Sequence, residues 1–388
     1  MKNTLKHAAL GLAATLSLAG AAGAETQGVT DTEVVVGSNQ DMSGIFAAFG
    51  APAMTAANLY FEQVNAAGGV HGRQIRLVVE DHAYQMPKAM SGLNKLVNSD
   101  KVFAMILSLG TPMNIASFPL LEQKGIPNIS PLTAARQMIE PPAPIKYAGT
   151  SSYYQQMITA VEYMKDNEGS TTVCAMIIPS DFGLEIQEGA VDAAKNLGMT
   201  YAGETKHKPD ELDFVGSLTK LKADGCDLIT IALGVRQAIT AIATAKKIGW
   251  NEVKFLGGSA SFHTAIAKVP GGVTDGFYAA AGWSDIESRV GDPDVAAFVK
   301  QYGDATGEAL PGTGAILGRS AAETFVRALE AAGADLTHET FQAAMESLDF
   351  EDKISDVHVT YSATDHQGAD AIVISKIEAG SWVEIARK

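Results

Sequence analysis

The sequence predicts an α/β protein with two lobes, each built on a mostly parallel sheet flanked by helices. From residue 33 onward, short apolar runs alternate with longer segments of helical periodicity. Pro141, Pro142 and Pro144 interrupt this alternation once, and a second series begins at residue 173. A chain of 388 residues, 46% of them hydrophobic, is long enough for two separate cores.

The first series predicts one Rossmann-like lobe, because buried strands and helices follow one another without a break. Strands are expected at 34–37, 75–80, 102–107 and 125–130. Helices are expected at 52–65 and 86–98, and Pro112 opens a third.

The second series predicts the other Rossmann-like lobe on the same grounds. Strands are expected at 173–178, 201–205, 228–233 and 253–256, and helices at 184–197, 214–223 and 237–248. We expect the strand-like segment 276–283 to cross back to the first lobe, where 295–302 and 318–332 add helices. The tail, 371–377 and 382–385, alternates like an antiparallel pair.

The N-terminus has the pattern of a secretory signal peptide. Lys2 and Lys6 precede an apolar run from Ala8 to Ala22, and Ala22-Gly23-Ala24 fits the small-residue cleavage site. We expect residues 1–24 to be removed and the mature chain to be exported to the periplasm. The alternative is an N-terminal membrane anchor, which the short apolar run disfavours.

Charge and cysteine content narrow the possible partners. The formal net charge of −15 argues against nucleic acid and anionic membrane surfaces as partners.

The two cysteines, Cys174 and Cys226, both lie near the start of a predicted strand. In an oxidising compartment they could pair, but two buried free thiols are an equal alternative.

One turn combines the features of an anion site. The strand 102–107 ends at Ser108, and Pro112 opens the next helix. The free N–H groups of such a helix start, with the hydroxyls of Ser108 and Thr111, suit a carboxylate. The alternative is an ordinary strand-to-helix turn, which every α/β sheet contains.

Enzyme signatures are missing from the sequence. There is no dinucleotide glycine pattern and no phosphate loop, and no histidines have zinc-ligand spacing. Residues 257–261 resemble a nucleophile elbow only loosely, because Ser261 stands where glycine is required. We therefore expect no enzyme, no cofactor and no metal, and we expect the small polar and aromatic residues after the strands to form a binding cleft.

Three motifs identify a resemblance. They are Asp41-Met42-Ser43-Gly44 with Phe49-Gly50, then 65–72 (NAAGGVHG), then 125–131 (GIPNISP). In this order the chain resembles the periplasmic solute-binding proteins of ABC transporters, in the branch of the leucine/isoleucine/valine-binding proteins, over nearly its whole mature length. The resemblance implies two discontinuous lobes joined by three crossovers, closing on a small solute and delivering it to a membrane permease. We expect a monomer that is not itself embedded in the membrane.

The lobes expected on this basis are each assembled from two segments. The N-terminal lobe would comprise 25–148 and 281–356, and the C-terminal lobe 149–280 and 357–388.

The resemblance also implies site residues, position by position. Phe49 matches the aromatic residue that covers the ligand from the first lobe. Thr111 matches the hydroxyl residue that binds the α-carboxylate, with Leu109 offering backbone beside it. Leu132 falls where a backbone carbonyl meets the ligand's ammonium group. Position alone adds Ser108, Thr133, Tyr153, Ser261 and Trp283 to the expected pocket.

The sequence departs from the amino-acid binders at three positions. Phe182 stands where the second lobe usually offers a tyrosine, Ala134 where these proteins carry a threonine, and Ser259 where a glutamate pairs with the ammonium. A buried ammonium without an anion costs several kcal/mol, on the order of a broken buried ion pair.

We therefore expect a ligand with a carboxylate or other polar acceptor end and an apolar or aromatic body, lacking a free α-amino group. Arg236, just past a strand end, would bind the carboxylate; alternatively it is a solvated residue at a helix start. Asp181 or Asp285 could replace the missing glutamate, which would leave a true branched-chain amino acid binder. A ligand-sensing periplasmic co-receptor for a membrane signalling protein is the other alternative.

Overall fold

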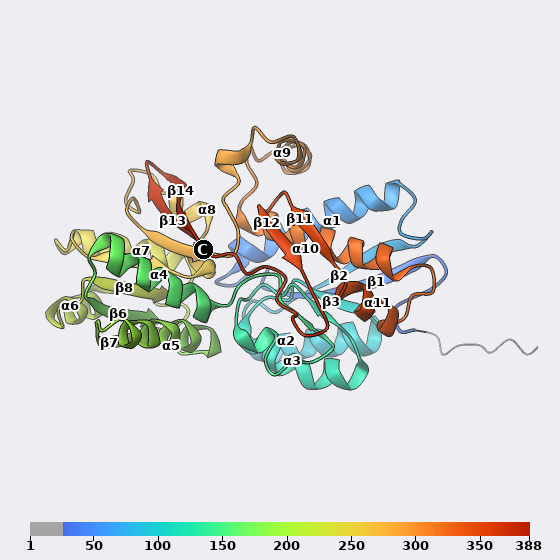
Figure 1. Cartoon of the computed structure of the whole chain (residues 1–388), viewed down its shortest axis with the longest axis horizontal. Coiled ribbons are helices and arrows are strands. Elements are labelled where there is room, and N and C mark those ends of the chain that lie inside the picture. Colours follow the sequence, from blue (N-terminus) through green and yellow to red (C-terminus); the bar gives the residue numbers. More distant parts are fainter. Residues whose placement is uncertain (1–25) are drawn as a thin grey trace, which may run out of the picture.

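A computed structural model describes residues 26–388, so the predicted signal peptide lies outside the described residues. The two lobes lie side by side along the long axis of the molecule (Figure 1). Each lobe has its own sheet, as the two series of the sequence predict. No helix within residues 26–388 is both long enough and apolar enough to cross a bilayer.

The sheet of the N-terminal lobe has five parallel strands. Their order is β2 (Gln74–Asp81), β1 (Glu33–Gln40), β3 (Ala104–Ile106), β4 (Asn128–Ile129) and β5 (Lys146–Tyr147). Seven of the eight residues of the central strand β1 are buried, because helices cover both faces of the sheet.

The helices of this lobe come from two distant parts of the chain. The first group is α1 (Ala47–Ala66), α2 (Met86–Asn94), which a π-helical turn continues to Ser99, and α3 (Thr111–Lys124). The second group is α9 (Pro293–Thr306), α10 (Thr313–Ala332) and α11 (His338–Met345).

Helices α1 and α10 pack unusually closely because α10 carries two glycines one turn apart. A Cβ at Gly314 would lie 2.3 Å from the carbonyl oxygen of Phe49, and one at Gly318 would lie 2.1 Å from that of Ala53. This close approach brings α10 against the lobe's first helix.

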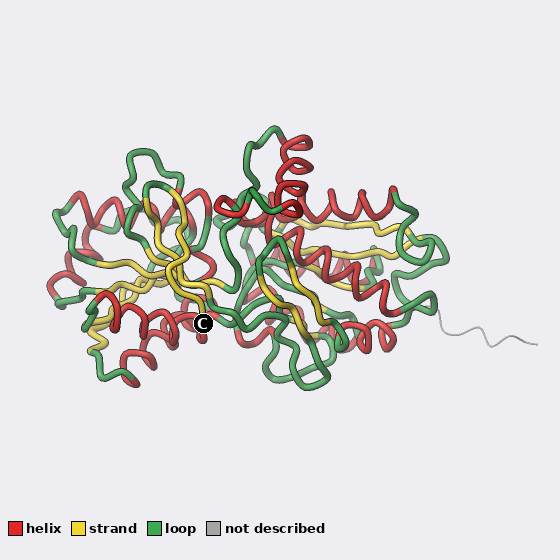
Figure 2. Tube along the Cα trace, turned by 45° about the horizontal axis from the view of Figure 1, so that its top comes forward, coloured by secondary structure: helices red, strands yellow, loops and turns green. Residues whose placement is uncertain are grey.

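The sheet of the C-terminal lobe has seven strands, five parallel and two antiparallel at one edge. Their order is β14 (Ser381–Arg387), β13 (Val373–Glu378), β10 (Tyr278–Ala281), β9 (Lys254–Gly257), β8 (Leu228–Ala232), β6 (Thr172–Ile177) and β7 (Thr200–Lys206). The flanking helices are α4 (Tyr153–Glu168), α5 (Asp181–Asn196), α6 (Val215–Ala223), α7 (Val235–Lys247) and the short α8 (Thr264–Ala267). Figure 2 shows these strands between helices.

Helix α4 was not expected from the sequence, although its start carries a clear signal. The hydroxyl of Ser152 accepts a hydrogen bond from the backbone N–H of Gln155, and the Gln155 side chain accepts one from the backbone N–H of Ser152. This reciprocal capping box fixes the helix start beside the segment that enters the second lobe.

Two expectations about the connections between lobes were wrong in detail. Strand β10 does not cross back, because it pairs with β9 and β13 in the second sheet; the chain leaves that sheet only after Ala281. The hairpin of β11 (Asp349–Asp352) and β12 (Val357–Thr360) spans the expected boundary at 356/357. Val357 and Val359 lie in one core cluster with β1 and α10, so β12 packs on the N-terminal lobe.

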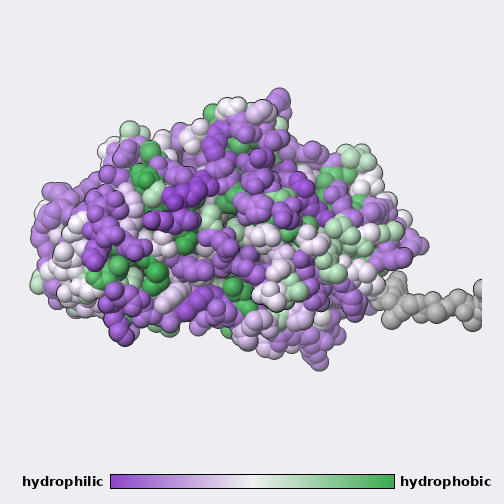
Figure 3. Space-filling view, viewed as in Figure 1, coloured by the Kyte–Doolittle hydropathy of each residue, from purple (hydrophilic) through white to green (hydrophobic). Residues whose placement is uncertain are grey.

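Cys174 and Cys226 form a disulfide with 5.9 Å between their Cα atoms. Cys174 lies in β6, and Cys226 lies just before β8, which pairs with β6. On the face seen in Figure 3, apolar residues are scattered over both lobes among hydrophilic ones.

Candidate ligand-binding cavity between the lobes

One cavity gathers residues from both lobes and from the segments that connect them. Ten of the thirteen residues expected at the site line it: Phe49, Leu109, Thr111, Leu132, Thr133, Ala134, Tyr153, Phe182, Ser259 and Trp283. The structure therefore brings together residues that lie as far apart in the sequence as 49 and 283.

The other three expected residues, Ser108, Arg236 and Ser261, do not line the cavity. The Ser108 hydroxyl lies 3.5 Å from the backbone nitrogen of Asn39, and the Ser108 carbonyl accepts a hydrogen bond from the Asn114 amide. Arg236 is exposed on the first turn of α7, whereas the next residue, Gln237, is buried. Successive helix residues point about 100° apart, so the expectation that Arg236 faces the ligand was wrong.

The start of α3 is held in place by the loops that follow β3 and β4. The backbone N–H of Leu132 donates to the Ser108 carbonyl at 3.0 Å, and that of Gly110 donates to the Leu132 carbonyl at 3.3 Å. The hydroxyls of Thr111 and Thr133 lie 2.6 Å apart across this junction. A polar pair therefore stands at the positive end of a helix dipole.

Gly110 makes this junction possible. Its φ of +102° lies in the region that favours glycine, and a Cβ there would lie 3.0 Å from the Met113 sulfur and 3.1 Å from Cε2 of Tyr84. Any other residue at position 110 would therefore strain the turn that presents Thr111.

Aromatic rings from both lobes form the walls. Phe46 of the N-terminal lobe lies 4.9 Å from Tyr84 and 5.8 Å from Phe182 of the C-terminal lobe, measured between ring centroids. Phe182 in turn lies 5.3 Å from Tyr153. The lobes thus touch through their aromatic residues, as in a closed state. Burial raises the pKa of Tyr153 to about 12, so its phenol stays neutral near pH 7.

The loop before α1 positions Phe46, a lining residue that the sequence analysis missed. The carboxylate of Asp41 accepts hydrogen bonds from the backbone N–H groups of Gly44, at 2.5 Å, and Phe46, at 2.9 Å. This explains the Asp-Met-Ser-Gly motif: its acid folds the loop back so that Phe46 and Phe49 both reach the cavity.

The cavity holds almost no charge. Among the described residues that line it, Asp352 is the one ionisable acid or base of the Asp, Glu, Lys, Arg and His types. It is 3% exposed, and its Oδ1 accepts hydrogen bonds from the backbone N–H groups of Ile354 at 2.9 Å and Ser355 at 3.2 Å. Burial raises the pKa of Asp352. Neither Asp181 nor Asp285 lines the cavity.

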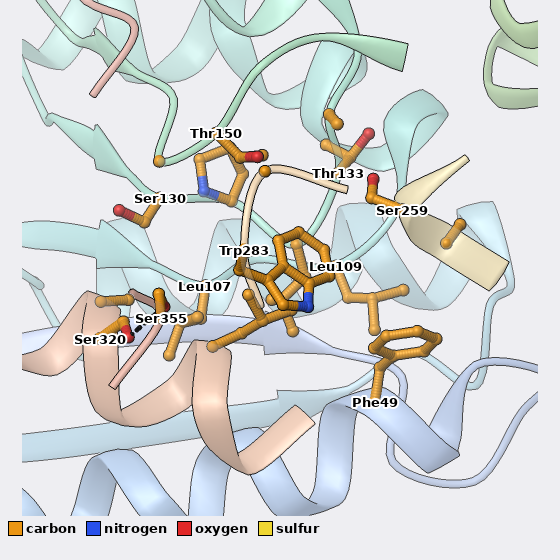
Figure 4. A pocket seen from close by; sticks show the side chains of 18 of the residues that line it. Phe49, Leu107, Leu109, Ser130, Thr133, Thr150, Ser259, Trp283, Ser320 and Ser355 are labelled. Atoms are coloured by element: carbon orange, nitrogen blue, oxygen red, sulfur yellow. Dashed lines mark hydrogen bonds between the residues drawn. The ribbon is translucent and has the colours of Figure 1, made fainter. Parts of the chain in front are cut away.

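Trp283 stands in the middle of the cavity. Figure 4 shows Ser130, Ser320 and Ser355 on one side of its indole and Thr133, Ser259 and Phe49 on the other. Asp352, which bonds to Ser355, therefore belongs to the side away from the α3 start.

The residues that the sequence analysis missed fall mainly on that far side. They come from the end of β3, from α10 and from the β11–β12 hairpin: Leu107, Ser320, Ala321, Thr324, Asp352, Ser355, Val357, Val359 and Tyr361. Leu317, which the sequence analysis also missed, packs against the cluster that contains Phe49 and Leu109. Their alternating or helical spacing marks buried faces but gives no sign of a cavity, because the same pattern is typical of an ordinary core.

Comparison with known proteins adds a family and a fold. A family model described as periplasmic binding protein matches residues 33–381. An amino acid binding protein of Pseudomonas aeruginosa is 26% identical over 217 residues, 55% of this chain and 57% of that protein.

Solved structures superpose closely. A fatty acid ABC transporter substrate-binding protein from Thermomonospora curvata gives a TM-score of 0.83 at 24% identity, covering 93% of both chains. A branched-chain amino acid ABC transporter protein from Thermus thermophilus with bound valine gives 0.83 at 22% identity, covering 92% of this chain and 96% of that one. At such identities these likenesses show the fold.

Proposed function

The chain belongs to the periplasmic binding protein family, and from this we propose that it captures a small monocarboxylate with an apolar body for an ABC importer. The observation that carries the proposal is the combination of a hydroxyl pair at the start of α3 with apolar and aromatic walls around it.

The polar end of the ligand would lie at α3. The first turn of a helix has unpaired N–H groups and a partial positive charge, and both favour a carboxylate. The hydroxyls of Thr111 and Thr133 can add donors to it, although they now bond to each other. No lysine, arginine or histidine among the described residues lines the cavity. The carboxylate would therefore be stabilised by the dipoles of the helix start and the hydroxyls rather than by an ion pair.

An α-ammonium group has no suitable partner beside this anion site. Ser259 and Ala134 carry no charge, so neither replaces an anion opposite an ammonium group. Asp352 lies with Ser355 beyond Trp283. The carboxylate and ammonium of an amino acid share one carbon, so they cannot reach both places. This favours an acid without an α-amino group.

The related structures support the role of a solute-binding protein, but their ligands belong to different chemical classes. One is a fatty acid ABC transporter substrate-binding protein and another has bound valine, so this fold serves for both acids and amino acids. We propose a periplasmic, monomeric, non-enzymatic protein that closes on its solute and hands it to membrane permease subunits.

The test is calorimetric titration of the mature chain after unfolding and refolding to remove retained solute. We expect binding of hexanoate and benzoate and weak or no binding of leucine and valine. Leucine binding more tightly than every acid would overturn the ligand class. It would favour the branched-chain amino acid binder, the second candidate, which the valine-bound structure supports.

A further inference from the structure

We propose that the ligand is an elongated carboxylate whose apolar chain passes Trp283 and ends in an inner chamber of the N-terminal lobe. This inference rests on the proposed function, and it adds the length and shape of the ligand. The inner chamber is the part of the cavity lined by Leu107, Ala321, Val357, Val359 and Tyr361, which share one core cluster of that lobe.

The walls of the inner chamber come from three elements of one lobe. Ala321 lies on α10, and Val357 and Val359 lie on one face of β12. Leu107 follows the end of β3. All of these residues are at least nine-tenths buried. A shared apolar wall of this kind suits a hydrocarbon chain and no charged group.

Several polar side chains near the chamber already have hydrogen-bond partners within the protein. Tyr361 donates its hydroxyl to the Ala148 carbonyl at 3.0 Å, which leaves its ring as an apolar wall. The hydroxyls of Ser320 and Ser355 lie 2.6 Å apart, and Asp352 accepts two backbone hydrogen bonds. Asp352 therefore has hydrogen-bond partners without any group of the ligand.

Leu107 also has an unusual backbone. Its φ is +56°, and Ser130 at the end of the neighbouring strand has a φ of +44°. Non-glycine residues pay on the order of 1–3 kcal/mol for such conformations, which cluster at ligand sites. Here both strained residues line the cavity.

Trp283 marks the passage between the two parts. It lies on the segment that leaves β10 and is 4% exposed, and its Nε1 has no hydrogen-bond partner among the described residues. Packing holds the ring, for example against Phe262 at 6.1 Å between ring centroids. Because no hydrogen bond fixes the indole, it can shift to let a chain pass.

The length of a straight-chain acid should then set its affinity. Each methylene that leaves water for the inner chamber tightens binding about fourfold. A cavity that ended at Trp283 would show no such gain for chains longer than the outer part holds.

The experiment is calorimetric titration of the refolded mature chain with straight-chain acids from butanoate to decanoate. We expect affinity to rise with chain length in the natural protein. Ala321→Phe should fill the inner chamber and remove the gain in affinity from butanoate to decanoate. Ala331→Phe makes the same change at an exposed position of α10 and should behave like the natural protein.

A second measurement does not depend on the folding of the Ala321→Phe variant. Decanoate should change the tryptophan fluorescence of the natural protein, and Trp283→Phe should remove that change while Trp250 and Trp382 remain. If butanoate binds but affinity is flat with chain length, the inner chamber is not used and the proposed function survives. If no acid in the series binds, and neither hexanoate nor benzoate does, the proposed function itself fails.

Discussion

The hydroxyls of Thr111 and Thr133 are the polar centre of a cavity that is otherwise apolar. They come from the ends of two neighbouring parallel strands and meet at 2.6 Å. Each is at least nine-tenths buried, so water competes little for them once the lobes are closed. A ligand oxygen that replaces this mutual hydrogen bond gains two donors at a helix start.

Thr111→Val should test this role directly, since valine keeps the shape and removes the hydroxyl. We expect carboxylate affinity to fall about tenfold, the loss of about 1.4 kcal/mol for one hydrogen bond to a charged group. Calorimetric titration with hexanoate measures it. Ser108→Ala removes a neighbouring hydroxyl that does not line the cavity. The hexanoate affinity of this variant should differ from that of the natural protein by no more than about twofold. Equal losses in both variants would contradict the assignment.

At the scale of single residues, the sequence predicted the positions of turns better than the directions in which side chains point. The turn after the strand at 102–107 pointed to Ser108 and Thr111, of which only Thr111 lines the cavity. The family resemblance supplied Phe49, Leu109 and Phe182, which all line it. Arg236 was misplaced because its neighbours along α7 decide which side of the helix is buried. A single position past a strand end does not fix that side.

At the scale of elements, the disulfide joins two neighbouring strands of the C-terminal sheet. The sequence placed both cysteines near strand starts but left pairing open, because pairing depends on β6 and β8 being adjacent. The strand order decides this: β6 lies between β7 and β8. Parallel neighbours begin at the same edge, so cysteines at their starts come together.

Removing this disulfide should destabilise the C-terminal lobe. The bridge closes a loop of 52 residues, for which the chain-entropy relation gives about 4 kcal/mol. We expect Cys174→Ala with Cys226→Ala to unfold at lower urea concentration, and reduction of the natural protein to have the same effect. Hexanoate affinity at low urea should stay unchanged, because neither cysteine lines the cavity. Identical unfolding curves with and without the bridge would contradict this.

The inner wall of the cavity is an element-scale result that the sequence did not predict. The helix over 318–332 was expected, but its contact with β12 and the end of β3 was not. These segments are more than 200 residues apart, counted from β3 to α10. Their apolar patterns are those of any buried face, so only their packing shows that space remains between them.

At the scale of the whole molecule, several contacts hold the lobes together. The backbone N–H of Arg136 donates to the Glu185 carboxylate at 2.9 Å, and the Arg136 side chain lies 2.5 Å from Glu188 on the same helix of the other lobe. Burial raises the pKa of Glu185 to about 7. On the opposite flank, His263 Nε2 lies 3.0 Å from the Ala48 carbonyl, and its ring lies 4.5 Å from that of Phe49.

His263 should make stability depend on pH. Burial lowers the pKa of His263 to about 4, against an ordinary value near 6.5 in the unfolded chain. In this pH range the unfolded chain binds a proton at His263 that the folded protein does not bind. The free energy of unfolding therefore falls as the pH drops from about 6.5 towards 4. Between pH 7 and 5 this one group should cost about 2 kcal/mol.

Thermal unfolding at pH 7 and pH 5 measures this dependence. His263→Gln removes the titrating group. The variant should therefore lose less stability between pH 7 and pH 5 than the natural protein does. The pH dependence of other buried groups, such as Glu185, is common to both proteins and cancels in the comparison. His71→Gln changes an exposed histidine and should leave the natural dependence in place. An unchanged dependence in His263→Gln would contradict the role given to burial.

The sequence by itself determined the family, the two parallel α/β series and the turn that presents Thr111. These features depend on periodicity and on turn residues that lie close together in the chain. Such local patterns can be recognised before the fold is known. Only the tertiary structure decided that Arg236 faces solvent, that Cys174 meets Cys226, that β12 belongs with the N-terminal lobe and that space continues behind Trp283. Each of these depends on which distant elements become neighbours, and many arrangements of apolar surfaces satisfy one apolar pattern until packing selects one of them.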